Sequence, residues 1–293
     1  MLPGHLFNRW VIRKRYFILR FAEYTILLAN PFHEVVEMQA MSPEYSVFWQ
    51  PGCSSCVRVK EFLKRLEIPF KSVNVLSDTE GRSELRRLGA RSIPIVSKGD
   101  AFTYAQSIED VARFVNRMDA VTDRLAPEVL FSKWTKVLSV ALAITPLIPD
   151  DSFKSPVNPS VPRTYRDLSY HIFQVVDAFL QTVQNGLEDW TVVANVAPHE
   201  LIQTKEDTVR EGEELTERLQ HWWLTLEDKS CQQSLKMFYG EHPLHQFLER
   251  STWHSAQHTR QLIALLSEKG IEMPVKLGAE DYAGLPMPKQ LWE

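Results

Sequence analysis

The chain has 293 residues, of which 44% are hydrophobic and 24% are charged. These values are typical of a soluble globular protein long enough for two domains, each with its own core. The formal net charge of −4 gives no sign of a nucleic-acid-binding surface, so we expect no nucleic-acid partner. Only three cysteines occur, which argues against a disulfide-stapled secreted fold and favours a reducing compartment, the cytoplasm.

Residues 1–41 differ in composition from the rest of the chain. Five basic residues precede the first acidic one: Arg9, Arg13, Lys14, Arg15 and Arg20. The apolar stretch at 21–28 is interrupted by Glu23 and is too short to cross a membrane, so we expect no membrane partner. We interpret 1–41 as an N-terminal extension, with disorder as one expectation, lying upstream of a start at Met38 or Met41. The alternative is a targeting peptide.

Residues 42–118 are predicted to form an α/β domain with elements in the order β-α-β-α-β-β-α. Strands are indicated by runs of β-branched and aromatic residues, and helices by apolar residues at helical spacing. We expect strands at 45–49, 70–75, 95–96 and 102–104, and helices at 53–66, 81–88 and 108–117. Ser107 is a suitable N-cap for the last of these helices.

Residues 119–272 show long helical patterns and no predicted strands. Helices are expected at 127–144, 165–182, 201–224 and 244–268, which together predict an all-α four-helix bundle. A proline-rich loop is predicted at 148–162. Residues 273–293 are predicted to be an extended C-terminal tail that lies on a surface.

Cys53 and Cys56 form a CxxC motif between the first predicted strand and the first predicted helix. Cys53 is expected at the helix N-terminus, where free backbone N–H groups and the helix dipole favour a thiolate. A thiolate performs disulfide exchange, and a second cysteine can resolve a mixed disulfide. Zinc knuckles share the CxxC motif, but this domain has no second ligand pair. The third cysteine, Cys231, is expected to be a small buried residue.

The tripeptide Ser92-Ile93-Pro94 lies just before the third predicted strand. Together with the CxxC motif and the β-α-β order, it resembles the glutaredoxins, the thioredoxin-fold family that uses glutathione. The resemblance implies that Cys53 is the nucleophile and Cys56 the resolving thiol, with glutathione as cosubstrate. It also implies a cis peptide bond before Pro94.

The same resemblance implies a glutathione site beside Cys53. The backbone of Ile93 would pair with glutathione, and Ser107 and Ile108 would receive its γ-glutamyl carboxylate at a helix N-terminus. The full implied set is Gln50, Arg91, Ser92, Ile93, Pro94, Ser107 and Ile108. The chain departs from the family at Gln50, usually a lysine, at Ala105-Gln106, usually Gly-Gly, and at Ser54-Ser55, commonly Pro-Tyr. Glutathione affinity and reduction potential therefore stay open at this point.

His254 and His258 lie four residues apart on a predicted helix, so both imidazoles can reach one metal ion. Because the chain has nine histidines, two ordinary surface residues are the alternative. His171, on the predicted helix 165–182, is a third candidate ligand. His242 and His245, on either side of a proline, are predicted to be surface residues.

A histidine on the second long helix and HxxxH on the fourth resemble the DinB-like bundle proteins. This resemblance implies that His171, His254 and His258 bind a divalent metal such as zinc or nickel. It further implies an open coordination position for water or substrate, suited to Lewis-acid chemistry or to lowering the pKa of a bound water or thiol. The alternative is a metal-free structural bundle.

The two resemblances together predict a glutathione-linked thiol–disulfide oxidoreductase coupled to a metal-dependent site that acts on a thiol or a glutathione conjugate. The expected partners are glutathione and a thiol or disulfide substrate. In one alternative, only the first domain is catalytic and the bundle serves homodimerisation or partner docking. In another, the chain is a redox or metal sensor.

Overall fold

The computed structural model describes residues 18–21, 24–27 and 44–292. Tyr45–Glu293 form one compact unit, which is distinct from the unit of residues up to Glu44. In the latter, strand β1 (Ile18–Phe21) pairs antiparallel with β2 (Tyr24–Leu27). This hairpin was not predicted. The remaining predictions for 1–41, including those on Met38 and Met41, lie outside the described residues.

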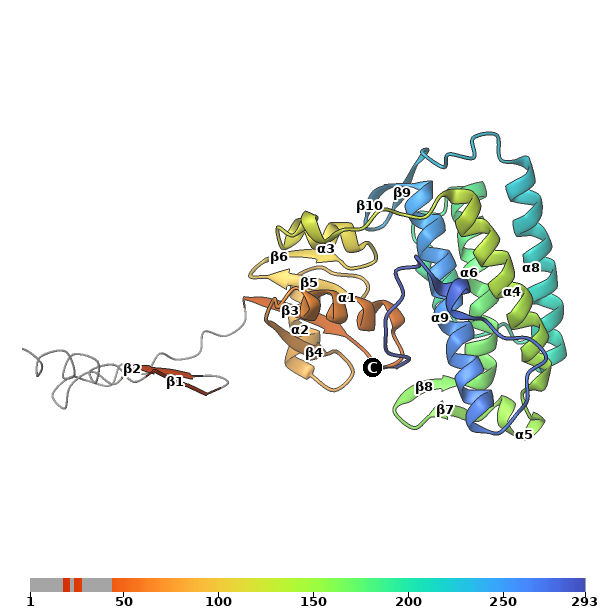
Figure 1. Ribbon diagram of the computed structural model, residues 1–293, viewed down its shortest axis with the longest axis horizontal. Helices are drawn as coiled ribbons and strands as arrows, with labels where there is room; N and C mark the ends of the chain where they lie inside the picture. The colour runs from red at the N-terminus through yellow and green to blue at the C-terminus, as the bar shows by residue number, and fades with distance from the viewer. Residues whose placement is uncertain (1–17, 22–23, 28–43, 293) are drawn as a thin grey trace, which may run out of the picture. The chain divides into compact units, whose positions relative to one another are not determined.

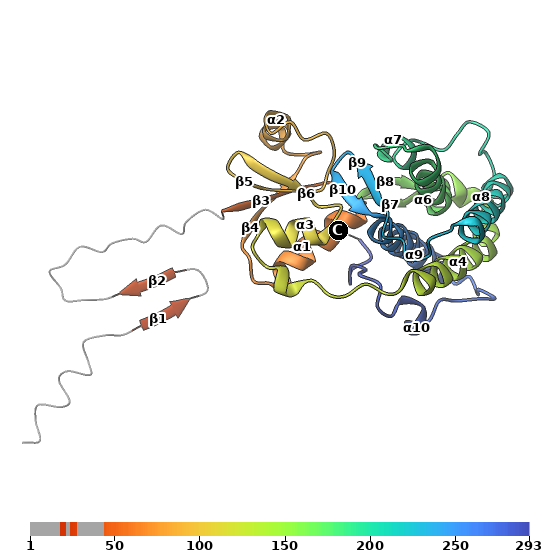
Figure 2. The ribbon, with the colours of Figure 1, turned by 90° about the horizontal axis from the view of Figure 1, so that it is seen from above.

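A four-stranded sheet forms the centre of the first domain of the larger unit (Figures 1 and 2). Its strands are β3 (Tyr45–Trp49), β4 (Phe70–Asn74), β5 (Ile95–Lys98) and β6 (Ala101–Tyr104), in the spatial order β4-β3-β5-β6. β3 and β4 are parallel, whereas β3–β5 and β5–β6 are antiparallel. A helical crossover joins the parallel pair, as such a pair requires.

Helices cover both faces of this sheet. α1 (Ser54–Arg65) and α3 (Ile108–Phe114) pack with Val47 in one apolar cluster. The adjacent residue, Phe48, belongs to a second cluster, which includes side chains of α2 (Thr79–Arg87). Successive side chains on a strand point to opposite faces, so β3 supplies both layers. The expected thioredoxin-like fold is confirmed.

The second domain is a bundle of four long helices, which lie side by side in both ribbon views (Figures 1 and 2). They are α4 (Pro127–Ile144), α6 (Tyr165–Asn185), α8 (Lys205–Thr225) and α9 (Leu244–Glu268). α9 packs against both α4 and α6, and for most of its length it is buried all round. α4 is long and apolar enough to cross a membrane, but its buried side chains belong to the bundle core. The expected four-helix bundle is confirmed.

The prediction that this region lacks strands is wrong. Two antiparallel hairpins each lead directly into a bundle helix: β7–β8 (Pro156–Asn158, Val161–Thr164) into α6, and β9–β10 (Ser234–Met237, Gly240–Pro243) into α9. Each strand has only three or four residues, too few to show alternation, and the prolines indicated a loop. Short helices α5 (Asp150–Phe153), α7 (Thr191–Ala194) and α10 (Ala279–Tyr282), and 3-10 turns at Met118–Ala120 and Thr145–Leu147, complete the fold.

The C-terminal segment 288–291 connects the two domains. Backbone N–H groups at 289–290 donate to the carboxylate of Glu61 on α1, at 2.7 and 2.9 Å. Backbone carbonyls at 290–291 accept hydrogen bonds from the side-chain amides of Gln257 and Gln261 on α9. This part of the predicted tail is therefore held by the helix that begins at the CxxC motif and by the helix that carries HxxxH.

The predicted surface position of His242 is wrong. The side chain is buried, and its Nε2 lies 3.3 Å from the Asp110 carboxylate on α3. His245 is half-buried, and its Nε2 donates to the backbone carbonyl of Leu125 at 2.7 Å. His242 thus belongs to the contact between the bundle and the first domain, and His245 to the contact between the bundle and the segment that leads into it.

Candidate functional site

The CxxC motif lies at the start of α1, where Cys53 is the N-cap. Cys53 and Cys56 are joined in a disulfide, and the Cys53 Sγ accepts a hydrogen bond from the Cys56 backbone N–H at 3.2 Å. Cys56 is fully buried, whereas Cys53 is half-buried and lines a cavity. An incoming thiol therefore meets Cys53 first.

Gly52 allows the close approach of this motif to the bundle. Its φ of +80° is a left-handed conformation, and a Cβ there would lie only 2.8 Å from Cγ1 of Val161 on β8. Both conditions favour glycine. The turn before α1 thereby lies against the β7–β8 hairpin.

The loop before β5 lines the same cavity. The Ile93–Pro94 peptide bond is cis, as the glutaredoxin resemblance implies. The carbonyl of Ile93 accepts hydrogen bonds from Gln106 Nε2 at 3.1 Å and from Ser92 Oγ at 3.3 Å. Both lone pairs of this carbonyl thus have partners within the chain, so a ligand would pair with the Ile93 N–H.

The residues predicted to bind glutathione fall into two groups. Gln50, Ser92 and Ile93 line the cavity beside Cys53, whereas Arg91, Pro94, Ser107 and Ile108 are not among its described lining residues. Ser107 is the N-cap of α3 as expected, but it is buried, and its Oγ accepts a hydrogen bond from Gln246 of α9 at 2.7 Å. The bundle thus covers the place where the sequence predicts the γ-glutamyl carboxylate.

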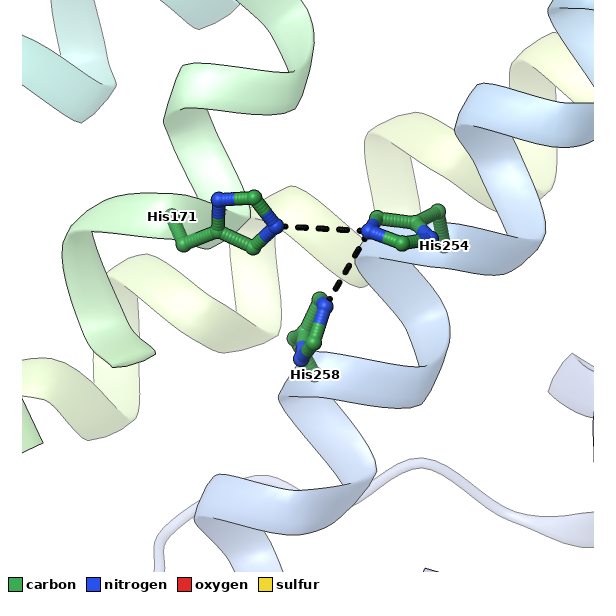
Figure 3. Close-up of side chains that lie close together, drawn as sticks. All are labelled: His171, His254 and His258. Atoms are coloured by element: carbon green, nitrogen blue, oxygen red, sulfur yellow. Dashed lines mark hydrogen bonds between the residues drawn. The ribbon is translucent and has the colours of Figure 1, made fainter. Parts of the chain in front are cut away.

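The three predicted metal ligands meet inside the bundle (Figure 3). His171 projects from α6, and His254 and His258 project from successive turns of α9. The Nε2 atom of His254 lies 3.3 Å from that of His171 and 3.2 Å from that of His258. All three side chains are buried.

Two glutamine side-chain amides fix the tautomers of His171 and His258. Nδ1 of His171 lies 3.2 Å from Gln174 Oε1, and Nδ1 of His258 lies 2.7 Å from Gln261 Oε1. Each amide nitrogen donates to a backbone carbonyl, which can only accept, so each Oε1 must be the acceptor. The two Nδ1 atoms therefore carry the protons, and the two Nε2 lone pairs point into the cluster.

The cluster fits a divalent metal ion. In a tetrahedral site with Zn–N distances of about 2.05 Å, two ligand nitrogens lie about 3.3 Å apart. The observed Nε2 separations of 3.2 and 3.3 Å match this spacing, and all candidate ligand atoms lie within 4.8 Å of one another. The Nε2 lone pairs of His171 and His258 both face the His254 Nε2, and a cation between the three nitrogens would be bound by all of them. Imidazole nitrogens suit zinc and nickel alike.

Burial keeps the imidazoles in the neutral form that binds metals. Desolvation, followed by the charge of Arg163, lowers the pKa of His171 to about 3. Desolvation also lowers the pKa values of His254 and His258 well below their usual value, with each affected by neighbouring histidines and arginines. All three rings are therefore available as ligands at neutral pH.

One cavity joins the disulfide to the histidine cluster. It has a volume of about 380 Å³, and its lining includes Cys53 and Ile93 from the first domain and all three histidines from the bundle. Two groups that the sequence places far apart thus share one space.

Sequence reasoning missed two basic residues in this cavity, Arg163 and Arg250. Arg250 had a detectable signal, because it precedes His254 by four residues and so shares the helical face of HxxxH. Arg163 lies on β8, in a segment predicted to be a loop, and no pattern in the sequence indicated it.

Comparison with known proteins identifies the family of the first domain. The glutaredoxin family model matches residues 45–102. A glutaredoxin-like 8.6 kDa protein of the rubredoxin operon of Clostridium pasteurianum, itself uncharacterized, is 36% identical over 52 residues, which are 17% of this chain and 69% of that protein. The chain belongs to the glutaredoxin family through this domain. A role in thiol redox chemistry follows from that membership.

Solved structures resemble each domain. A thioredoxin-like protein is 30% identical over 25% of this chain and 95% of its own, with a TM-score of 0.24. The Bacillus subtilis DinB-like protein YjoA is 17% identical over 50% of this chain and 95% of its own, and its TM-score is 0.39. YfiT of the same organism, described as a probable metal-dependent hydrolase with an unusual four-helix bundle topology, is 13% identical over 52% and 92%, with a TM-score of 0.39.

Proposed function

We propose that this protein is a glutathione-linked thiol–disulfide oxidoreductase whose bundle adds a metal-dependent site for the thiol substrate. The observation that carries the proposal is the single cavity lined by both Cys53 and the three histidines. A glutaredoxin acting alone needs no second chemical site beside its cysteine. The shared cavity makes one thiol compound, glutathione or its conjugate, the natural ligand of both.

The redox half proceeds by two exchanges. A glutathione thiolate attacks Cys53 Sγ, the Cys53–Cys56 bond breaks, and the electron pair leaves on Cys56, which takes up a proton. A second glutathione thiolate attacks the glutathione sulfur of the mixed disulfide and releases the Cys53 thiolate and glutathione disulfide. Two electrons thus pass from two glutathione thiols to the CxxC pair, which can then reduce a substrate disulfide. The Cys56 N–H and the α1 N-terminus stabilise the Cys53 thiolate.

In the bundle half, His171, His254 and His258 would hold the metal through their Nε2 atoms. The metal would supply Lewis acidity and lower the pKa of a bound thiol or water. Gln174 and Gln261 keep the histidine Nδ1 protons in place and so orient the ligands. We place this activity in the cytoplasm, where the free thiol of Cys231 and glutathione stay reduced.

Variants of the CxxC motif test the redox assignment. Cys53→Ser should abolish turnover of a glutathione mixed disulfide, whereas Cys56→Ser should keep this monothiol activity and lose reduction of protein disulfides. Cys231→Ser is the matched control and should retain both activities. A Cys53→Ser protein that still reduced the mixed disulfide would show that Cys53 is not the nucleophile.

Metal analysis tests the second half. The purified chain should contain about one zinc or nickel ion per molecule, and His171→Ala or His254→Ala should lose it. The exposed histidine His199 provides the control, since His199→Ala should keep the metal. Failure of the wild-type chain to bind either ion at neutral pH would leave only the redox function.

A further inference from the structure

The cavity between Cys53 and the histidine cluster has an excess of positive charge. Arg163 and Arg250 line it, and Asp167 is the one carboxylate among its described lining residues. Asp167 is already engaged, because its Oδ2 accepts the Thr164 backbone N–H in the capping box of α6, and its Oδ1 lies 3.7 Å from Arg166 Nε. The cavity therefore holds more cationic than anionic groups even before any metal binds.

Arg250 is the more buried of the two cations. Its exposed fraction is 7%, its guanidinium stacks on the Trp190 ring at 3.8 Å, and its Nη2 donates to Gln106 Oε1 at 3.1 Å. Its Nε has no hydrogen-bond partner among the described residues. A buried N–H without an acceptor is costly unless a ligand completes it.

Arg163 adds a second free donor. It is half-buried on β8, and its Nη1 also lacks a partner within the described part of the chain. Desolvation lowers the pKa values of both Arg163 and Arg250 to about 10. The negative charge of Asp167 acts in the opposite direction on Arg163, whose pKa it raises. Both groups stay cationic at neutral pH, so both remain available to an anion.

The position of Arg250 suits a ligand that reaches both chemical groups. It lies one helical turn before His254 on α9, and Gln106, its hydrogen-bond partner, bonds the Ile93 carbonyl beside the CxxC motif. Arg250 thus contacts a residue beside the CxxC motif and lies on the same helix as two residues of the histidine cluster. A planar guanidinium fork matches the two oxygens of a carboxylate.

We propose that Arg250, assisted by Arg163, binds a carboxylate of the thiol substrate inside this cavity. The inference rests on the proposed thiol exchange at Cys53 for the identity of the ligand. It makes the protein selective for carboxylate-bearing thiols over neutral or cationic ones. Helix α9 then supplies both the substrate-binding cation and two of the three candidate metal ligands.

Binding of a non-reactive ligand tests the proposal apart from the chemistry. S-methylglutathione has no free thiol, and its diethyl ester lacks both carboxylates. Isothermal titration calorimetry of the oxidised, full-length wild-type protein should show the acid binding about 10- to 100-fold more tightly than the ester, as expected for charge-assisted hydrogen bonds. Equal affinity for acid and ester would overturn the proposal without any variant.

Variants then test which residue binds the carboxylate of the ligand. Arg250→Gln should weaken binding of the acid by a similar factor and leave binding of the ester unchanged. Arg218→Gln, on an exposed position of α8, should leave both unchanged. If Arg250→Gln does not fold, Arg163→Gln should give the same pattern with a smaller loss.

Two further comparisons distinguish failure of the carboxylate assignment from failure of the proposed redox role of Cys53. If the preference for the acid appears in zinc-loaded protein and vanishes after chelation, the metal binds the carboxylate and the assignment to Arg250 is wrong. If the preference and its dependence on Arg250 persist while Cys53→Ser retains full redox turnover, the carboxylate site stands and the proposed redox role of Cys53 falls.

Discussion

Replacing Gln261 by leucine is expected to weaken zinc binding by about 10- to 100-fold, the usual effect of removing the partner of a metal-ligating histidine. Gln261 Oε1 lies 2.7 Å from Nδ1 of His258. Its Nε2 donates to the Leu291 carbonyl, which fixes the amide. Leucine has a similar volume but accepts no hydrogen bond, so the buried Nδ1–H would lose its acceptor. That loss costs about 1–3 kcal/mol, which agrees with about 1.4–2.7 kcal/mol for the expected change in affinity.

Competition with a chromophoric zinc chelator at constant pH measures this effect. Gln220→Leu makes the same chemical change on an exposed position of α8 and should bind zinc as the wild type does. Thermal unfolding in the presence of chelator shows whether each variant is folded. A folded Gln261→Leu protein with a zinc affinity within about twofold of wild type would refute the reasoning that this amide orients His258.

Three further predictions concern packing, reactivity and the tail. Gly212→Ala should lower the free energy of unfolding by about 1 kcal/mol, because a Cβ there would lie 2.9 Å from the Phe173 ring; unchanged urea unfolding would contradict this close contact. Burial raises the pKa of Cys231 to about 11, which reduces its thiolate fraction at pH 8 about 100-fold. In the reduced protein, mass spectrometry should therefore find Cys231 alkylated by iodoacetamide far more slowly than Cys53, and equal rates would disprove it. Glu61→Ala should speed hydrogen exchange of the backbone N–H groups at 289–290 by about tenfold or more, and unaltered protection would mean that this carboxylate does not hold the segment.

The elements with a strong local signal were predictable. The bundle helices 127–144 and 244–268 were expected at the bounds where they occur, because each begins at or directly after a proline and has a long apolar period. Ser107 was expected as an N-cap and is one. The hairpins β7–β8 and β9–β10 were missed, since strands of three or four residues carry too little pattern to outweigh their prolines.

The candidate site was predictable in its parts and unpredictable in its assembly. Spacing along one helix indicated His254 and His258, and the β-α turn indicated Cys53. Their meeting in one cavity depends on contacts between residues about two hundred positions apart in the chain, which no local pattern encodes. For the same reason, the burial of His242 against Asp110 and the covering of Ser107 by α9 escaped prediction.

The contacts of the segment 288–291 have a consequence for the order of folding. Its hydrogen bonds to Glu61 span 228 and 229 residues, whereas those to α9 span about thirty. Closing the longer loop costs more chain entropy, and contacts of high sequence separation form slowly. We therefore expect each domain to form its own core first and the hydrogen bonds between the segment 288–291 and Glu61 to form last. The amide that steadies His258 bonds the Leu291 carbonyl across only 30 residues, so metal uptake during refolding should accompany the recovery of helical signal and precede the formation of the contacts with Glu61.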